Sequence, residues 1–169
     1  DSENGVFEDY GLYTQVEQLN KTALKAHGLN PEAQLYKVNF FEFYRYEDSI
    51  KLTSDPTYDQ SAFEYYLEIK GDSDHTKLIQ MLADLNDDSQ SIELILEKYF
   101  DVENIAYWMA FQILTGNTDT QSRNMYLYSP QNSDTWYILD WDNDGMLFRT
   151  EHNVKQHNVD VGWEYGISN

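Results

Sequence analysis

Asp119, Asn124 and Asp142 have the residue types and the spacing of a phosphoryl-transfer site. They lie within GNTDTQSRNMYLYSPQNSDTWYILDWDND, residues 116–144. In enzymes that transfer phosphoryl groups, one Asp orients the attacking hydroxyl and an Asn five residues later holds a metal ion. An Asp beyond the next hairpin holds the Mg²⁺ that bridges the nucleotide phosphates. An Asp and an Asn at this spacing are also common as helix and turn caps, so the neighbouring elements must decide between these interpretations.

The elements around these residues follow the order that such a site requires. Residues 102–115 are apolar at helical spacing, with Asp101 as the expected N-cap and Gly116 as the C-terminal stop. Residues 125–128 and 135–139 predict two short strands, joined by the turn-forming SPQNSD. We therefore expect a helix, a loop, and a β-hairpin that delivers an acidic cluster to the site.

A calcium loop competes for the same residues. Asp140, Asp142, Asp144, Gly145 and Glu151 satisfy the D-x-D-x-D-G-x₅-E spacing of an EF-hand loop. An EF-hand needs a helix before the loop, whereas TWYIL at 135–139 is typical of a strand. The alternative that stays open is a non-catalytic structural or coat module that binds Ca²⁺ through residues 140–151.

Several blocks along the chain resemble the spore coat protein H (CotH) family of atypical, secreted or spore-associated protein kinases. They are YGLYTQVEQLNK at 10–21, LYK at 35–37, GNTD at 116–119, RNMYLY at 123–128 and DWDND at 140–144. The resemblance implies an α+β, protein-kinase-like fold, with ATP and Mg²⁺ as cofactors. It also implies a coat or secreted protein as substrate, and a location in the spore coat or outside the cell.

The same resemblance assigns roles to individual residues. Asp119 is similar to the family's catalytic Asp, whereas Asn124 and Asp142 are similar to its metal ligands. Asp144 matches the second acidic residue of the W-D-x-D pattern and is a further candidate for metal contact. Asp140 stands where many relatives have Pro, so it is assigned no catalytic role.

The N-terminal part predicts a strand over residues 11–17 and a helix over 19–28 that ends at Gly28. In a kinase-like fold these elements are the last strand of the small lobe and the first helix of the large lobe. Residues 15–18, including Glu17, then form the hinge that faces adenine. Lys37 is placed to reach phosphate as a point charge. The alternative that stays open is that these residues form an ordinary strand and helix with core contacts, and that Lys37 is simply exposed.

The chain is expected to be a single domain over residues 1–169, part of a larger kinase-like domain that is truncated at both ends. It begins without Met and leaves no room before the first strand for a Gly-rich loop and its partners. Mostly large-lobe helices and the site-bearing hairpin would remain. We therefore expect the isolated piece to be inactive.

The amino-acid composition argues against two classes of binding partner. The net charge is −19, from 30 acidic and 11 basic residues, which argues against nucleic acid and against an anionic membrane, because binding to either relies on Lys and Arg. The chain has no Cys, so it has neither disulfides nor thiolate metal sites. In the middle of the chain, apolar spacing predicts helices over 58–70, 75–86 and 91–100 and a strand over 40–46.

Overall fold

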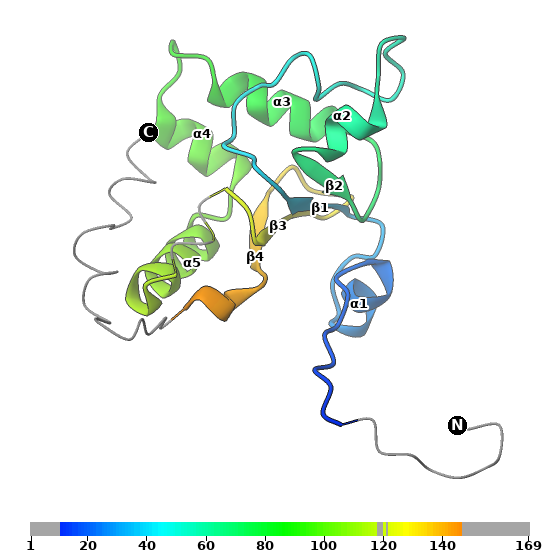
Figure 1. Cartoon of the computed structure of the whole chain (residues 1–169). Helices are drawn as coiled ribbons and strands as arrows, with labels where there is room; N and C mark the ends of the chain where they lie inside the picture. The colour runs from blue at the N-terminus through cyan, green and yellow to red at the C-terminus, as the bar shows by residue number, and fades with distance from the viewer. Residues whose placement is uncertain (1–10, 118–119, 121, 147–169) are drawn as a thin grey trace, which may run out of the picture.

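The structure, a computed structural model, describes residues 11–117, 120 and 122–146. Within this part of the chain, five α-helices and four strands form an α+β fold (Figure 1). In chain order they are α1 (Lys21–Ala26), β1 (Gln34–Val38), α2 (Gln60–Glu64), β2 (Leu67–Ile69), α3 (Thr76–Leu85), α4 (Ile92–Tyr99), α5 (Val102–Thr115), β3 (Met125–Ser129) and β4 (Tyr137–Asp140), followed by the 3₁₀ turn η2 (Asn143–Gly145).

The four strands form one antiparallel sheet in the order β2-β1-β3-β4. Because strand side chains alternate between the two faces of a sheet, each face has its own core. On one face, Tyr36 and Leu127 pack with residues of α3 and α4. On the other face, Leu35 and Tyr126 pack with Leu24 of α1. Figure 1 shows α3 and α4 on the opposite side of the sheet from α1.

The amphipathic helix α3 closes the larger core. Leu78, Met81 and Leu82 recur at helical spacing and are all fully buried. Lys77 on the same helix reaches the turn between β3 and β4. Its Nζ atom donates to Ser129 Oγ at 2.8 Å, to the Pro130 carbonyl at 2.7 Å and to the Ser133 carbonyl at 2.8 Å. The hairpin is therefore fixed to α3 at its turn end.

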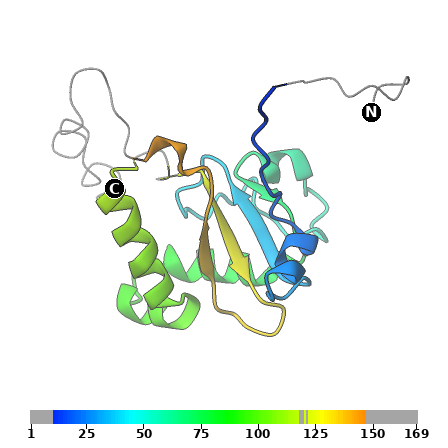
Figure 2. The ribbon, with the colours of Figure 1, turned by 90° about the horizontal axis from the view of Figure 1, so that it is seen from below.

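Helix α5 covers the edge of the sheet at β4, as Figure 2 shows from below. The Asn104 side chain accepts from the Ile138 backbone N–H at 2.8 Å and donates to the Ile138 carbonyl at 3.2 Å. These two bonds replace the partner strand that an edge strand lacks. The predicted boundaries of α5 are confirmed. Asp101 accepts from the Asn104 N–H, and Gly116 ends the helix with a left-handed φ of 64°.

The structure corrects the prediction of one long helix over residues 58–70. Helix α2 is short, and residues Leu67–Ile69 instead form β2, an edge strand that pairs with β1. Leu67 and Ile69, two positions apart, both pack against the larger core. A period of two and a helical period fit so short an apolar run equally well, and pairing with β1 decides between them.

Two predicted strands are absent from the described residues. Residues 40–46 form a loop in which Phe40, Phe43 and Tyr46 adopt positive φ angles of 51°, 60° and 44°, a conformation that interrupts any extended pairing. Residues 11–17 also form no strand, and Leu12 is fully exposed. No described strand pairs with them, and an unpaired strand leaves its backbone groups without partners.

Candidate active site

The hairpin brings the two principal metal-ligand candidates to one end of the sheet. Met125 lies opposite Asp140 in the β3–β4 register. Asn124 directly precedes β3, and Asp142 follows β4 by two residues, so both lie at the same end. Both also adopt left-handed backbone conformations, with φ of 56° for Asn124 and 55° for Asp142. Asn and Asp tolerate this conformation better than other residues with a side chain, so the tight turns at this end suit the same residue types that bind metal.

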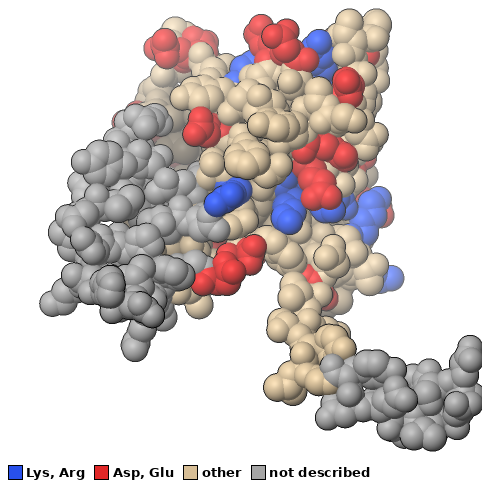
Figure 3. Space-filling model, viewed as in Figure 1, with Lys and Arg blue, Asp and Glu red and all other residues tan. Residues whose placement is uncertain are grey.

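A polar pocket of about 500 Å³ opens at this end of the sheet. Its lining includes Lys37, Asn39, Glu64, Glu68, Arg123 and Asn124. Figure 3 shows basic side chains in a row across this face of the molecule, between two groups of acidic side chains. Lys37 and Asn124, which were singled out from sequence for phosphate and metal contact, thus line one pocket.

Aromatic side chains support Lys37 from the sheet. Its Nζ atom lies 5.6 Å from the centroid of the Trp141 ring, within the range of a cation–π contact. Trp141 packs edge-on against Tyr126 at a centroid distance of 5.4 Å, and Tyr126 lies opposite Lys37 in the register of β1 and β3. Burial, and to a lesser degree the charge of Glu68, raise the pKa of Tyr126 to about 12. Tyr126 is therefore a neutral support at physiological pH.

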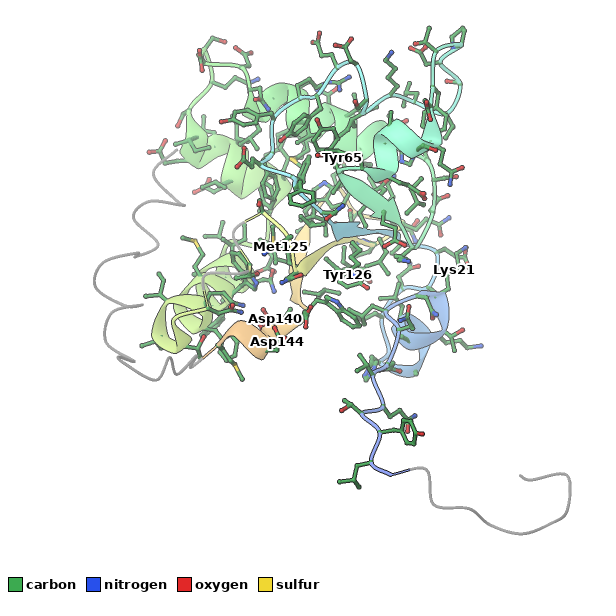
Figure 4. The ribbon with its side chains drawn as sticks, viewed as in Figure 1. Lys21, Tyr65, Met125, Tyr126, Asp140 and Asp144 are labelled. Atoms are coloured by element: carbon green, nitrogen blue, oxygen red, sulfur yellow. The ribbon has the colours of Figure 1, made fainter. Side chains whose placement is uncertain are left out.

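A buried network of side-chain amides joins α5 to the loop after β4. Gln112 Nε2 donates to Asp140 Oδ1 at 2.6 Å, and Asn117 Nδ2 donates to Gln112 Oε1 at 2.9 Å. Asn117 Nδ2 also donates to Asn143 Oδ1 at 3.1 Å. Gln112 and Asn117 are fully buried. Figure 4 shows Asp140, at the end of β4, close to Asp144 in the turn η2.

The carboxyl group of Asp140 reflects its place in this network. Although much of the residue is exposed, partial burial of the carboxyl raises its pKa, while hydrogen bonds from Gln112 and Trp108 act in the opposite direction. Asp142 differs because it is exposed and its side chain makes no capping bond to the turn that follows. The structure thus separates a carboxylate held by the protein from one that faces solvent.

The proposed catalytic residue, Asp119, lies outside the described residues. The nearest described residues on either side of it are Asn117, which belongs to the network above, and Thr120, which is fully buried and donates from Oγ1 to the Asn124 carbonyl at 3.4 Å. Its catalytic role stays a prediction. Glu151, on which the calcium loop depends, also lies outside the described residues.

The donors at this end of the sheet fit Mg²⁺ that arrives with a nucleotide. Mg²⁺ is usually held by one or two carboxylates together with phosphates and water, and Asn124, Asp142 and Asp144 offer oxygen donors of this kind. Among the described residues, no three His, Asp or Glu side chains converge into a protein cage for a metal. A strand, β4, also leads into the acidic loop in place of the helix that begins an EF-hand.

The remaining predicted site residue, Glu17, makes an exposed hydrogen bond with His27. Its Oε2 atom is 2.7 Å from His27 Nε2, and the strand that was to carry it as part of a hinge is not formed in the described part of the chain. Its contact with adenine stays a prediction.

Sequence reasoning missed Gln112 and Asn117, because a Gln in an apolar helix and an Asn after its end carry no sign of the bond between them.

Comparison with known families supplies the last observation. The sequence model of the CotH family, described as CotH kinase protein, matches residues 2–167, nearly the whole chain. No curated protein matches the chain significantly. None of the described helices has the length and apolar character needed to span a bilayer. Since the family match covers almost every residue, the chain belongs to the CotH family.

Proposed function

We propose that this protein is an atypical, kinase-like phosphotransferase of the spore coat protein H type. It transfers the γ-phosphoryl group of ATP to Ser or Thr of a coat or secreted protein, in the spore coat or outside the cell. The observation that carries the proposal is the placement of Lys37, Asn124 and Asp142 at one end of the sheet, where Lys37 and Asn124 line a polar pocket of about 500 Å³. Family membership gives independent support.

The residues divide the work of phosphoryl transfer among them. Asn124, Asp142 and Asp144 would provide oxygen ligands for Mg²⁺, which when bound would neutralise charge on the phosphates. Lys37 and Arg123 bring positive charge to a pocket that Glu64 and Glu68 also line. Asp119 accepts the proton of the substrate hydroxyl. The hydroxyl oxygen bonds to the γ-phosphorus of ATP while the bond between that phosphorus and ADP breaks. Positioning and electrostatics provide most of the catalysis in such a reaction.

The proposal is tested by calorimetric titration of the full-length protein with ATP and Mg²⁺. We expect Asp142→Asn to weaken the binding of Mg·ATP at least about tenfold, because a ligand carboxylate is lost. Asp134→Asn is the matched control, since Asp134 is exposed in the turn at the other end of the hairpin. Equal affinities for the wild type and both variants would exclude Asp142 as a ligand.

Titrations of the same protein with Ca²⁺ and with Mg·ATP distinguish a calcium-binding module from a kinase. If residues 140–151 form a calcium loop, Ca²⁺ binds tightly without nucleotide, and Glu151→Gln abolishes that binding. If the site belongs to a kinase, Glu151→Gln leaves the affinity for Mg·ATP unchanged. Transfer of labelled phosphate from ATP to protein Ser or Thr, lost in Asp119→Asn, then completes the assignment.

A further inference from the structure

Asp140 is the first member of a chain of hydrogen bonds that the reaction itself does not use. The chain runs from Asp140 through Gln112 and Asn117 to Asn143, with donor-to-acceptor distances of 2.6, 2.9 and 3.1 Å. Gln112 and Asn117 are fully buried, so each amide group that loses its partner there costs free energy. The loss of any one hydrogen bond in the network therefore lowers the stability of the folded protein.

A carboxylate at position 140 gives the network its direction. An ionised carboxylate only accepts hydrogen bonds, whereas an amide both donates and accepts. The Gln112 amide must therefore turn its Nε2 group toward Asp140, which leaves Oε1 facing Asn117. Asn117 then presents Nδ2 as a donor, both to Gln112 and to Asn143. One acceptor at the end of the chain thus sets the orientation of the amides behind it.

Both ends of this network, Asp140 and Asn143, lie at the end of β4 and just after it, whereas its interior member Asn117 follows α5. Asn117 lies two residues before Asp119, in the loop that leads to Asn124. Asn143 lies between Asp142 and Asp144, and Asp140 precedes Asp142 by two residues. The bond between Asn117 and Asn143 is thus a direct contact between the loop with the proposed base and the loop with the proposed metal ligands.

We propose that Asp140 is a positioning residue. Through Gln112 and Asn117 it holds the end of α5, two residues before Asp119 in the sequence, against the loop of Asp142 and Asp144. This inference rests on the proposed function for its purpose, but the network can be measured without any ligand.

A charge exchange provides the sharpest test. Asp140→Asn replaces a group that can only accept by an amide that can also donate, so the orientation of the Gln112 amide is no longer imposed. Gln112→Glu places a second carboxylate 2.6 Å from the first, so neither single variant keeps the fixed direction of the network. The double variant Asp140→Asn with Gln112→Glu restores it. The new amide donates to the new carboxylate, whose second oxygen still accepts from Asn117.

Two readouts on the ¹⁵N-labelled full-length protein decide the outcome. The first is the set of NMR signals from the Asn117 side-chain amide and the Asn124 and Asp142 backbone amides. The second is the affinity for Mg·ATP. We expect each single variant to shift these signals and to weaken affinity about tenfold, the scale of losing a partner behind a metal ligand, and the double variant to recover both. Asp134→Asn again serves as the control.

The results separate this inference from the function that it serves. Signals and affinity that are unchanged in folded Asp140→Asn would overturn the positioning role, as would a folded double variant that recovers neither. If the wild type does not bind Mg·ATP, the proposed function fails. The NMR signals then decide alone, since recovery in the double variant supports coupling of the loops by Asp140 and its absence refutes it.

Discussion

Helices α3 and α5 lie beside the same sheet but bury opposite kinds of side chain. Helix α3 buries Leu78, Met81 and Leu82 completely, whereas Gln112 is the fully buried side chain of α5. Much of the apolar surface of α5 faces outward, with Tyr107 70% and Leu114 80% exposed. Burial of apolar side chains stabilises a fold, whereas a buried polar network fixes geometry. The α3 side thus stabilises the domain, and the inner face of α5 holds the candidate site in place.

A matched pair of substitutions tests this difference most strongly. Leu82 on α3 is fully buried, and Leu114 on α5 is 80% exposed. We expect Leu82→Ala to lower the free energy of unfolding by about 3 to 4 kcal/mol, from lost burial and a residual cavity. Leu114→Ala should change it by less than about 0.5 kcal/mol. Urea denaturation measures both, and similar losses would contradict the division between the two helices.

The residue before α3 makes the stability of that side depend on pH. His75 is fully buried, its Nδ1 atom lies 2.8 Å from the Tyr36 hydroxyl, and its ring stacks on Phe63 at 4.1 Å. Burial lowers the pKa of His75 from 6.5 to about 4, against the opposing charges of Asp74 and Asp72. Its Nε2 atom has no hydrogen-bond partner among the described residues, so the neutral ring is the form that fits.

The sign of the pH effect follows from this lowered pKa. Above pH 6.5 neither state binds the proton, and as the pH falls toward 4 the unfolded chain binds it while the folded protein does not. We expect His75 to remove about 2 kcal/mol of stability between pH 7 and pH 5. His75→Phe should lose correspondingly less over that interval in denaturation experiments. An equal loss in both proteins would assign the acid sensitivity to other groups.

The smallest effect is expected on the outer face of α5. Tyr107→Ser with Leu114→Ser should leave the free energy of unfolding within about 1 kcal/mol, because both side chains are already largely exposed. Self-association at high concentration should decrease, since exposed apolar patches promote contact between molecules. Sedimentation velocity measures the association. Loss of folding in this variant would show that the face is covered in the native protein.

The parts of the fold that sequence predicted well are those with local signals. Asp101 and Gly116 mark the ends of α5 because they satisfy backbone groups within their own turns. The hairpin follows from two short apolar runs and the turn-forming residues between them. Strand β2 was missed because its identity depends on pairing with β1, far away in sequence. The same holds for residues 40–46, where tertiary packing of Phe41 and Phe43 overrides strand propensity.

The candidate site divides in the same way. Asn124 and Asp142 were predicted from residue type and spacing, and Lys37 with the help of the family resemblance. The structure places Asn124 and Lys37 on one pocket and Asp142 at the same end of the sheet. The network of Gln112, Asn117 and Asp140 was not found. Its members interact across the gap between a helix and a strand, and each taken alone has an ordinary place in a helix, a loop or a strand end.

The continuity of the site-bearing segment has a consequence for the order of folding. Helix α5 and the β3–β4 hairpin are neighbours in the chain, whereas contacts between the hairpin and the N-terminal part of the chain join residues far apart in sequence. One such contact is the hydrogen bond from the Asn30 N–H to the Tyr128 hydroxyl, which joins residues 98 positions apart. Local contacts form faster than contacts that close long loops. We expect the helix and hairpin to form a nucleus first and β1, which carries Lys37, to join late, so the two metal-ligand candidates are placed before the pocket is complete.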